Sequence, residues 1–409
     1  MALPGVRTVL KDRFFSLSRS NIPETVRVVV IGRRNNSEVV PEGDPGVERN
    51  FVPYLALGEE AVIANFGAGS ELHRGYLETV SGGAARVFLV SWGSTDSNAD
   101  DYAPDSALSG SGTEDPFTLA FDAAEAIQGD ILVPYGRGGF LGEDEATPSE
   151  YELGFQADHE GLTNLVARVA ARCKEITDRS NPCFAVMGVT PMEGGDVRPT
   201  NEINDHFDFP NLPDRESIED SYVVVVATEL RPVGYPTELG WTNGAATYAG
   251  FLSTLEAEMA STGKRLYNIR QLRYAPTRVQ QEEMVAKGLT PVKQNFSREA
   301  VVVDGLTFGK ATSDFTRLST LRIVFAAIEL VRQTAENYVG YPATLHHRNA
   351  MDTAIGSQLR GMLITGALLD ADYDMDWISG ARESTVRINL VLTPAFEMRN
   401  IDVSISIRL

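Results

Sequence analysis

The chain has 409 residues, of which 43% are apolar and 22% are charged, and its formal net charge is −20. This length accommodates two or three domains of about 100–200 residues each. The acidic balance, with no run of basic residues to offset it, argues against nucleic acid or an anionic membrane as a partner. No apolar run approaches the roughly 18 residues of a membrane-spanning helix, and the N-terminus lacks the basic and apolar regions of a signal peptide.

The first predicted elements lie in the N-terminal quarter of the chain. Residues 4–18 contain a Pro-Gly pair and mix apolar with polar side chains, so we expect an extended segment rather than a helix. A β-branched run over 26–31 predicts a strand buried on both faces. The elements predicted next are helices over about 59–66 and 71–80, with glycine stop signals at 67 and at 82–83, and a buried strand over 87–90.

Residues 93–116 are rich in Ser, Asp and Gly and poor in apolar residues, which is typical of a surface loop. Helices and strands alternate after this loop. The predicted helices cover 121–127, 162–173 and 248–259, and the predicted strands cover 131–133, 184–189 and 222–227. Strands that alternate with helices of this length indicate an α/β layer with a mostly parallel sheet.

The pattern changes from about Gly305 onward. One long helix is predicted over 319–338, with stop signals at Gly340 and Pro342, and a second helix over 350–368. Two strands with clean alternation, over 386–392 and 401–409, close the chain. This end is typical of a smaller α+β domain, so the predicted fold class is α/β plus α+β.

Two glycine-containing segments have the general look of nucleotide-binding loops. The glycines between 136 and 142 lack the last glycine of a dinucleotide fingerprint, because Leu141 stands there, and three carboxylates follow at 143–145. The segment from Gly305 to Lys310 is one residue short of a phosphate-binding loop, and Ala311 replaces the Mg²⁺-binding hydroxyl. We therefore predict no nucleotide cofactor.

The remaining candidate chemical groups are also weak. The histidines are His73, His159, His206, His346 and His347. They have no metal-site spacing, and no GxSxG nucleophile motif is present. We interpret the last two histidines as surface residues at a helix entry. We predict that the protein is not an enzyme, with a hydrolase or nucleotide-binding enzyme as the alternative and a multimeric shell protein of another kind as a third choice.

Two further groups allow a structural or a ligand-binding interpretation. Cys173 and Cys183 could be a redox or metal pair, but their places on a helical stripe and at a strand start favour buried thiols. Four aspartates alternate with other residues over 370–376 and could bind Ca²⁺ along an extended segment. Without a glycine turn or a closing Glu, a solvated or partner-facing acidic edge is the favoured interpretation.

The last nine residues carry the most specific signal. Five apolar side chains alternate with four polar ones from Ile401 to Leu409. A strand this amphipathic has to place its apolar face on something, although chain ends usually fray. It could be an edge strand in the subunit's own sheet, or it could be donated to the sheet of a neighbour. The residue pattern alone leaves both possibilities open.

The order of segments resembles that of contractile tail sheath proteins. The segments that carry the resemblance are 4–6, 82–90, 126–134, 171–173, 178–189, 287–291, 299–307, 320–323 and 394–405. The best match is the turn from Lys287 to Pro291, where Thr290 stands in place of the asparagine that sheath proteins carry. The acidic, Pro-rich segment 191–220 does not align with the family pattern, so its fold and role stay open.

The resemblance implies a polymer-forming structural subunit. It implies an N-terminal extended arm over 1–22 and a C-terminal strand arm over 399–409. Between them it implies a subtilisin-like α/β domain over 23–304, which lacks the catalytic triad and carries a surface loop over 93–116. A smaller α+β domain that faces the tube is implied over 305–398. The implied strand-donating residues are Val6, Val9, Ile401, Val403, Ile405, Ile407 and Leu409.

The resemblance also implies an assembly with named partners. Stacked hexameric rings of this chain would form a six-fold helical sheath around a tail tube protein, in contact with baseplate and tail terminator proteins. Contraction of the sheath would drive the tube through a host envelope. The expected location is the virion tail, after assembly in the host cytoplasm, with no cofactor.

Overall fold

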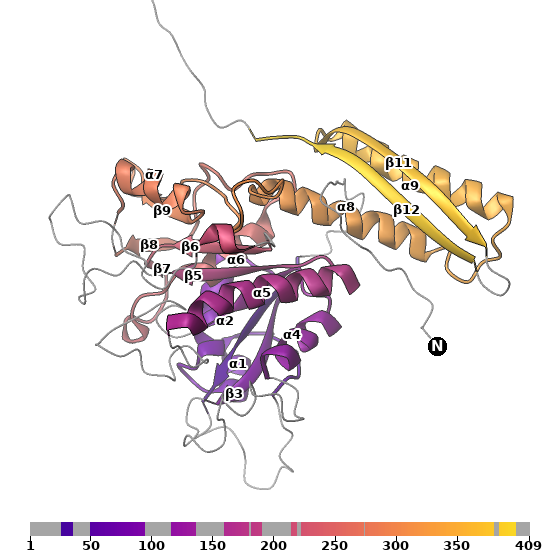
Figure 1. The fold of residues 1–409 in the computed structure, drawn as a ribbon. Coiled ribbons are helices and arrows are strands. Elements are labelled where there is room, and N and C mark those ends of the chain that lie inside the picture. Colours follow the sequence, from indigo (N-terminus) through magenta and orange to yellow (C-terminus); the bar gives the residue numbers. More distant parts are fainter. Residues whose placement is uncertain are drawn as a thin grey trace, which may run out of the picture.

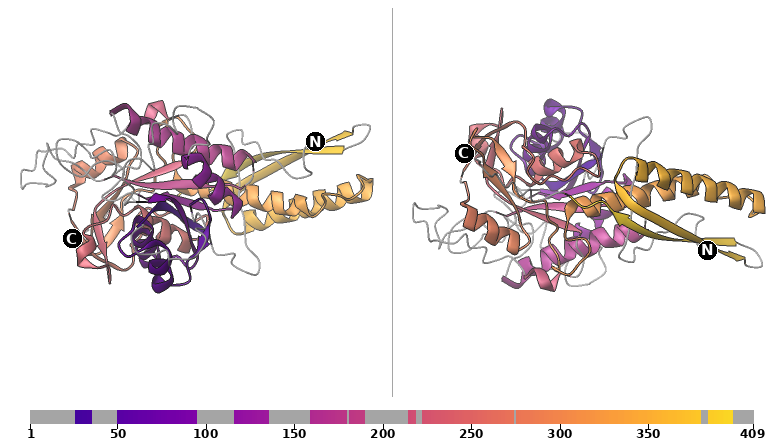
Figure 2. Two further views of the ribbon diagram at one scale, coloured as in Figure 1. Left: turned by 90° about the horizontal axis from the view of Figure 1, so that it is seen from below. Right: turned by 90° about the horizontal axis from the view of Figure 1, so that it is seen from above.

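The computed structural model describes residues 26–35, 50–94, 116–135, 159–179, 181–189, 214–218, 222–273, 275–379 and 384–397. These residues form a body built on an eight-stranded sheet and an elongated extension made of helices and a two-stranded sheet (Figure 1). The extension projects from one side of the body, as the views from below and above show (Figure 2). The chain is therefore a mixed α/β protein with one large sheet, as the sequence predicts.

The body sheet has the strand order β10-β9-β6-β5-β4-β1-β3-β2. Its strands are β1 (Val28–Arg34), β2 (Tyr54–Leu55), β3 (Val87–Ser94), β4 (Ile131–Pro134), β5 (Phe184–Val189), β6 (Val223–Ala227), β9 (Thr290–Gln294) and β10 (Ala300–Val302). The pairs from β3 to β9 are parallel, whereas β2 and β10 join the two ends in antiparallel fashion. Every residue of β4, β5 and β6 is buried, which explains why these strands are continuous apolar runs in the sequence.

Helices cover this sheet, and one of them, over 278–286, was not predicted from the sequence. The body helices are α1 (Glu59–Phe66), α2 (Glu71–Gly82), α4 (Pro116–Ala126), α5 (His159–Arg179), α6 (Ala245–Thr254) and α7 (Arg278–Ala286). Helix α2 begins where the Ser70 hydroxyl accepts a hydrogen bond from the His73 amide. It ends at Gly83, whose φ of 110° favours glycine. A small second sheet pairs β7 (Leu230–Pro232) with β8 (Ile269–Leu272).

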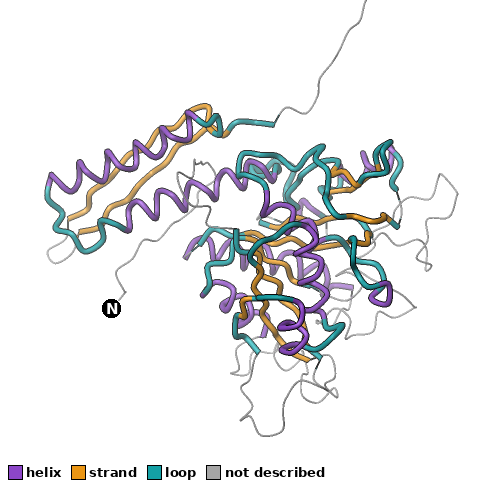
Figure 3. Tube along the Cα trace, turned by 180° about the vertical axis from the view of Figure 1, so that it is seen from behind, coloured by secondary structure: helices purple, strands orange, loops and turns teal. Residues whose placement is uncertain are grey.

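The extension consists of α8 (Leu318–Glu336), α9 (Leu345–Ile364), β11 (Leu368–Ser379) and β12 (Ser384–Pro394). The hairpin of β11 and β12 lies along the two helices (Figure 3). Tyr373 donates a hydrogen bond from its hydroxyl to Asp352 Oδ1 on α9 at 2.9 Å, and the Arg348 guanidinium lies 4.5 Å from the ring centroid of Trp377. These contacts fix one face of the hairpin on α9.

The structure departs from the predictions at several elements, including two helices and one strand. The helix predicted over 248–259 ends at Thr254, so Leu255 and Met259 lie beyond it. The helix predicted over 350–368 starts and ends earlier, at Leu345 and Ile364, because the Thr344 hydroxyl caps its start and Gly366, with φ of 77°, lies just beyond its end. Strand β11 was not predicted as a strand, since its alternate aspartates have low strand propensity. The predicted strand over 401–409 and most of the loop over 93–116 lie outside the described residues.

The crossing of α2 and α6 gives a test of the body packing. A Cβ at Gly250 would lie 2.1 Å from the carbonyl oxygen of Thr79, and backbone atoms cannot give way as a flexible side chain can. We expect Gly250→Ala to lower the free energy of unfolding by about 3 kcal/mol or more. Gly58→Ala is the matched control, because a Cβ there meets nothing within 4 Å. Equal denaturation midpoints for the two variants would contradict this packing.

Candidate assembly site

The residues predicted to be donated to neighbours lie outside the described part of the chain. This holds for Val6 and Val9 and for all five apolar residues of the segment 401–409. The structure does describe the chain up to Glu397, directly before the C-terminal segment. It also describes the two-stranded hairpin of β11 and β12.

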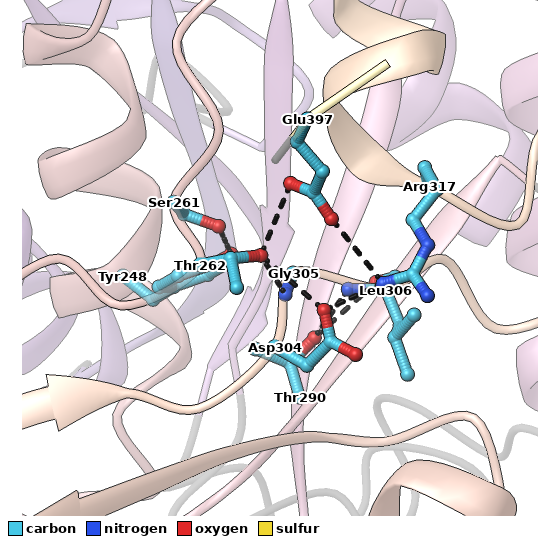
Figure 4. A network of polar contacts seen from close by, with 9 residues as sticks. All are labelled: Tyr248, Ser261, Thr262, Thr290, Asp304, Gly305, Leu306, Arg317 and Glu397. Atoms are coloured by element: carbon cyan, nitrogen blue, oxygen red, sulfur yellow. Dashed lines mark hydrogen bonds and ion pairs between the residues drawn. The ribbon is translucent and has the colours of Figure 1, made fainter. Parts of the chain in front are cut away.

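A polar cluster holds the chain where the C-terminal segment begins (Figure 4). The Arg317 guanidinium, just before α8, lies 2.6 Å from Asp304 Oδ1 and 3.3 Å from Glu397 Oε1. The Thr262 hydroxyl lies 3.2 Å from Glu397 Oε2 and accepts a hydrogen bond from the Gly305 amide. The cluster therefore ties three parts of the molecule together: the body, the start of α8 and the chain after β12.

A second arginine fixes the first turns of α8 in the body. The Arg322 guanidinium donates hydrogen bonds to the carbonyl oxygens of Leu252, Leu255 and Met259, at 3.2, 2.6 and 3.2 Å. Burial lowers the pKa of Arg322 to about 10, which still leaves the group charged at neutral pH. One of these carbonyls belongs to the last turn of α6, and the other two lie in the chain that follows the helix. The three hydrogen bonds explain why the polar chain after Thr254 turns toward α8.

The hairpin presents one face to the helices and one face outward. Its inward side chains on β11 are those of Ala371, Tyr373, Met375 and Trp377. Asp370, Asp372, Asp374 and Asp376 alternate with them and are exposed. The sheet has two strands within the part of the chain that is described, so each strand has one edge without a further strand. The predicted acidic edge is thus the outward face of a strand.

The segment from Gly305 to Lys310, which has the general look of a phosphate loop, is filled by the protein itself. The amides of Gly305 and Leu306 donate to the hydroxyls of Thr262 and Thr290, both at 3.1 Å. The amides of Phe308 and Lys310 donate to carbonyl oxygens of Val223 and Ile218. Backbone donors that are already engaged cannot hold a phosphate. The Thr290 hydroxyl bonds to both backbone groups of Leu306, because it also donates to the carbonyl oxygen at 3.2 Å.

The candidate catalytic histidines do not meet a nucleophile among the residues described. His73 is buried, and its ring contacts the Gly69 amide and Glu59. His346 and His347 lie in the first turn of α9, which confirms their interpretation as residues of a helix entry. His206 and the side chain of His159 lie outside the described residues. Cys173 and Cys183 are buried free thiols, as the sequence favours.

Glu78 is a fully buried carboxyl on α2. It contacts Tyr135, which follows the carboxyl end of β4, where α/β enzymes place catalytic groups. Its side chain is fully buried, and the hydroxyls of Tyr135 and Tyr235 both donate to its Oε1. Burial raises the pKa of Glu78 to about 7, although the tyrosines and Arg74 favour the charged form. Among the described residues, Glu78 is therefore held inside the body by two tyrosine hydroxyls.

The described ranges contain neither a candidate metal centre nor a membrane-spanning helix. No group of three or more His, Cys, Asp or Glu side chains there is arranged to hold a metal ion. Among the helices of the structure, none has the length and apolar character needed to cross a bilayer.

Known proteins match this chain in structure but not in sequence. No protein-family model matches the chain, and no curated protein sequence matches it. The helical sheath of the anti-feeding prophage in its contracted state superposes with a TM-score of 0.60, at 14% identity over 99% of both chains. The fold is that of contractile sheath proteins.

Two further solved sheath structures agree. The sheath tail protein from Desulfitobacterium hafniense matches with a TM-score of 0.54, at 11% identity over 95% of this chain and 100% of that one. The sheath complex of an extracellular contractile injection system, PVC, in its contracted state matches with a TM-score of 0.53, at 11% identity over 99% and 98%. The sheath fold thus covers the body and the extension together, which agrees with the resemblance found in the sequence.

Sequence reasoning missed the residues that organise this site. Arg317, Arg322 and Glu397 were not singled out, because their partners lie far away in the sequence. The sequence offers one signal for them: two arginines flank the predicted start of a long apolar helix. Buried cations are rare, so arginines beside an apolar helix indicate that acidic or carbonyl partners lie nearby.

Glu78 should make stability depend on pH. Its folded pKa of about 7 exceeds its ordinary value of 4.5, so the folded state holds the proton more tightly and its contribution to stability falls as pH rises between these values. Relative to the parent, Glu78→Gln should therefore gain about 2–3 kcal/mol in free energy of unfolding between pH 5 and pH 8. Urea denaturation of both proteins measures this difference. A difference that does not change with pH would contradict the assignment.

The stability that the polar cluster at Glu397 gives the fold should depend on the charge of Arg317. Replacing this arginine with Gln leaves the carboxylates of Asp304 and Glu397, which are 3% and 10% exposed, without their shared cation. We expect the free energy of unfolding to fall by about 3 kcal/mol or more. Arg278→Gln is the control, because Arg278 is 91% exposed and pairs only across one helical turn with Glu282. An equal fall in the free energy of unfolding for Arg278→Gln would contradict a stabilising role of the cluster.

Proposed function

We propose that this chain is a structural subunit of a contractile sheath that polymerises around a tube and contracts. The observation that carries the proposal is the superposition on sheath proteins over nearly the full length of this chain and of the other chains. Further parts of the proposal are a subtilisin-like body, six-fold helical rings, contact with a tail tube, baseplate and terminator protein, and a virion tail assembled in the host cytoplasm.

Strand donation is the proposed means of polymerisation. The hairpin of β11 and β12 offers two strand edges, and the alternating segment 401–409 has the pattern of a strand that adds to such an edge. The proposed donor residues remain Val6 and Val9 in the N-terminal arm and the five apolar residues from Ile401 to Leu409. The cluster around Glu397 supports this proposal, because it fixes the point from which the C-terminal segment leaves its own subunit.

The energies suit a subunit that stays soluble until it meets a template. Burial of five aliphatic side chains contributes about 7–15 kcal/mol, whereas ordering nine residues costs about 9–18 kcal/mol. One arm is therefore near balance before its backbone hydrogen bonds are counted. Cooperative addition to an existing ring, where several arms are placed at once, then decides whether the polymer forms.

Substitution in the terminal strand tests the proposal. We expect Ile405→Asp, and a chain truncated after Asn400, to melt as monomers within about two degrees of the parent, because a donated strand adds little to its own subunit. Both should fail to form the tubes or rings that electron microscopy should show for the parent. Ser406→Asp, on the opposite face of the strand, is the matched control and should assemble.

Two results would contradict the proposal. A drop of many degrees in the melting temperature of Ile405→Asp would place the strand in its own subunit's sheet. Uniform small particles from the parent protein, under conditions that favour assembly, would argue against a sheath subunit altogether.

A further inference from the structure

The turn between β9 and β10 places an aromatic side chain in solvent. Phe296 lies in this turn and has a relative exposure of 110%, the largest value among the large apolar residues that the structure describes. Single exposed apolar residues are common on protein surfaces and are not evidence of a binding site by themselves. Phe296 is a candidate contact only if the turn holds it in place and a matching surface exists on the molecule.

Hydrogen bonds within the turn fix its backbone. The Asn295 amide donates to the Glu299 carbonyl, and the Arg298 amide donates to the Asn295 carbonyl, both at 3.0 Å. The Asn295 side chain accepts from the Glu299 amide and donates to Glu299 Oε2, both at 2.9 Å. These bonds hold Arg298 at a φ of 60°, which is uncommon for residues other than glycine. Phe296 therefore lies on a preorganised backbone, which lowers the entropy that a contact costs.

The surroundings of Phe296 are basic. Arg298 is exposed in the same turn, and Lys293 lies on β9 just before it. Glu299, the carboxylate in this stretch of sequence, pairs with Arg265. Lys293, Phe296 and Arg298 thus combine one aromatic side chain with two cations, and they are called the basic tip below.

The edge strand at the other end of the sheet carries complementary groups. β2 is the last strand opposite β10, and its pairing with β3 continues one residue past its end. Leu55 and Leu57 lie two residues apart in this extended stretch, so they share one face, and they are 36% and 81% exposed. Glu59 and Glu60 follow in the first turn of α1 and are exposed. These four residues form an apolar surface with an acidic border, called the edge patch below.

The basic tip and the edge patch cannot meet within one copy of the chain. They belong to opposite ends of the eight-stranded sheet, and Figure 1 shows β9 and α1 at opposite ends of the body. Neighbouring strands lie about 4.8 Å apart, which separates the two ends by roughly 30 Å. Contact between them therefore needs two copies and joins unlike surfaces. Repeated contacts of this kind generate a ring when the rotation closes and a helix when it does not.

We propose that the basic tip of one copy docks on the edge patch of a second copy. Phe296 packs on Leu55 and Leu57, and Arg298 pairs with Glu60. An aromatic anchor in an apolar patch supplies much of the affinity in such contacts, while the opposite charges fix the orientation and disfavour contact between like ends. The inference rests on the proposed function and adds to it a contact between side chains of two bodies. The contact involves neither the terminal segments nor the hairpin of β11 and β12.

Cross-linking of two full-length variants tests this contact. Ser297→Cys places a thiol beside Phe296, and Gly58→Cys places one beside Leu57, where a Cβ meets nothing within 4 Å. The two native cysteines are buried and do not compete. An equimolar mixture, oxidised with copper–phenanthroline under conditions that favour assembly, should yield at least ten times more covalent dimer than either variant alone. Denaturing gel electrophoresis without reductant measures the yield.

Further substitutions show which side chains carry the contact. Phe296→Ser, added to the Ser297→Cys variant, should reduce the yield at least tenfold. Leu345→Ser is the matched control, at a 74% exposed residue of the extension, and should change the yield less than twofold. Glu60→Arg in the Gly58→Cys variant should reduce the yield at least threefold. Arg298→Glu in the other copy should then restore it to within twofold, because opposite charges meet again.

Each result supports or overturns the assignment. Equal yields from the mixture and from either variant alone overturn it, and so does a yield that Phe296→Ser leaves unchanged. If Phe296→Ser melts below the parent, the charge exchange between Arg298 and Glu60 decides instead, and a failure to restore the yield overturns the contact. The cross-link needs no polymer, so it is read separately from electron microscopy of the parent. Tubes without the cross-link overturn this contact alone, and the cross-link without tubes or rings overturns the proposed function alone.

Discussion

Burial of the first turns of α8 in the body is the constraint on which the extension depends. Leu318, Leu321 and Val324 are buried, and Phe325 stacks on Tyr222 beside the start of β6. A helix that enters a packed core must also satisfy the polar groups it brings along, and Arg317 and Arg322 do so with carboxylates and carbonyl groups. Since α9 and the hairpin pack on α8, their direction follows from this one junction.

The body itself is packed as a rigid unit. Its central strands are buried on both faces, and the helices α2 and α6 approach so closely that their contact requires glycine. The polar groups at the carboxyl end of the sheet, where an enzyme would bind substrate, contact one another: Glu71 with Arg33, and Glu78 with two tyrosines. Among the described residues, these polar groups are thus engaged inside the body.

The extension is less completely packed than the body, since its sheet has two strands in the part of the chain that is described. A two-stranded sheet is marginal alone, and here α9 supports one face through Tyr373 and Arg348. The open edges would invite pairing with any extended chain, and the aspartates of β11 oppose this. Under the proposed function, these open edges are where strands of neighbouring copies would be added.

Local sequence patterns determined most elements of the body and the long helix of the extension. Strands β1, β3, β4, β5 and β6 and helices α1, α2, α5 and α8 follow from runs of β-branched residues, helical periodicity and glycine stops, because these signals act over neighbouring residues. The segment order also indicated the sheath fold. Where local signals conflict with packing, as in the acidic strand β11, the sequence misleads, since burial of alternate residues against α9 outweighs low strand propensity.

Only the tertiary structure decided the site. Arg317 and Glu397 are far apart in the sequence, and no periodicity relates them; they meet because α8 starts at the body and β12 returns to it. The pairing of β11 with β12 likewise depends on distant elements, since α9 packs on β11 and α8 packs on β12. Contacts between distant segments depend on the summed packing of the whole chain, and a single sequence contains no local signal for that sum.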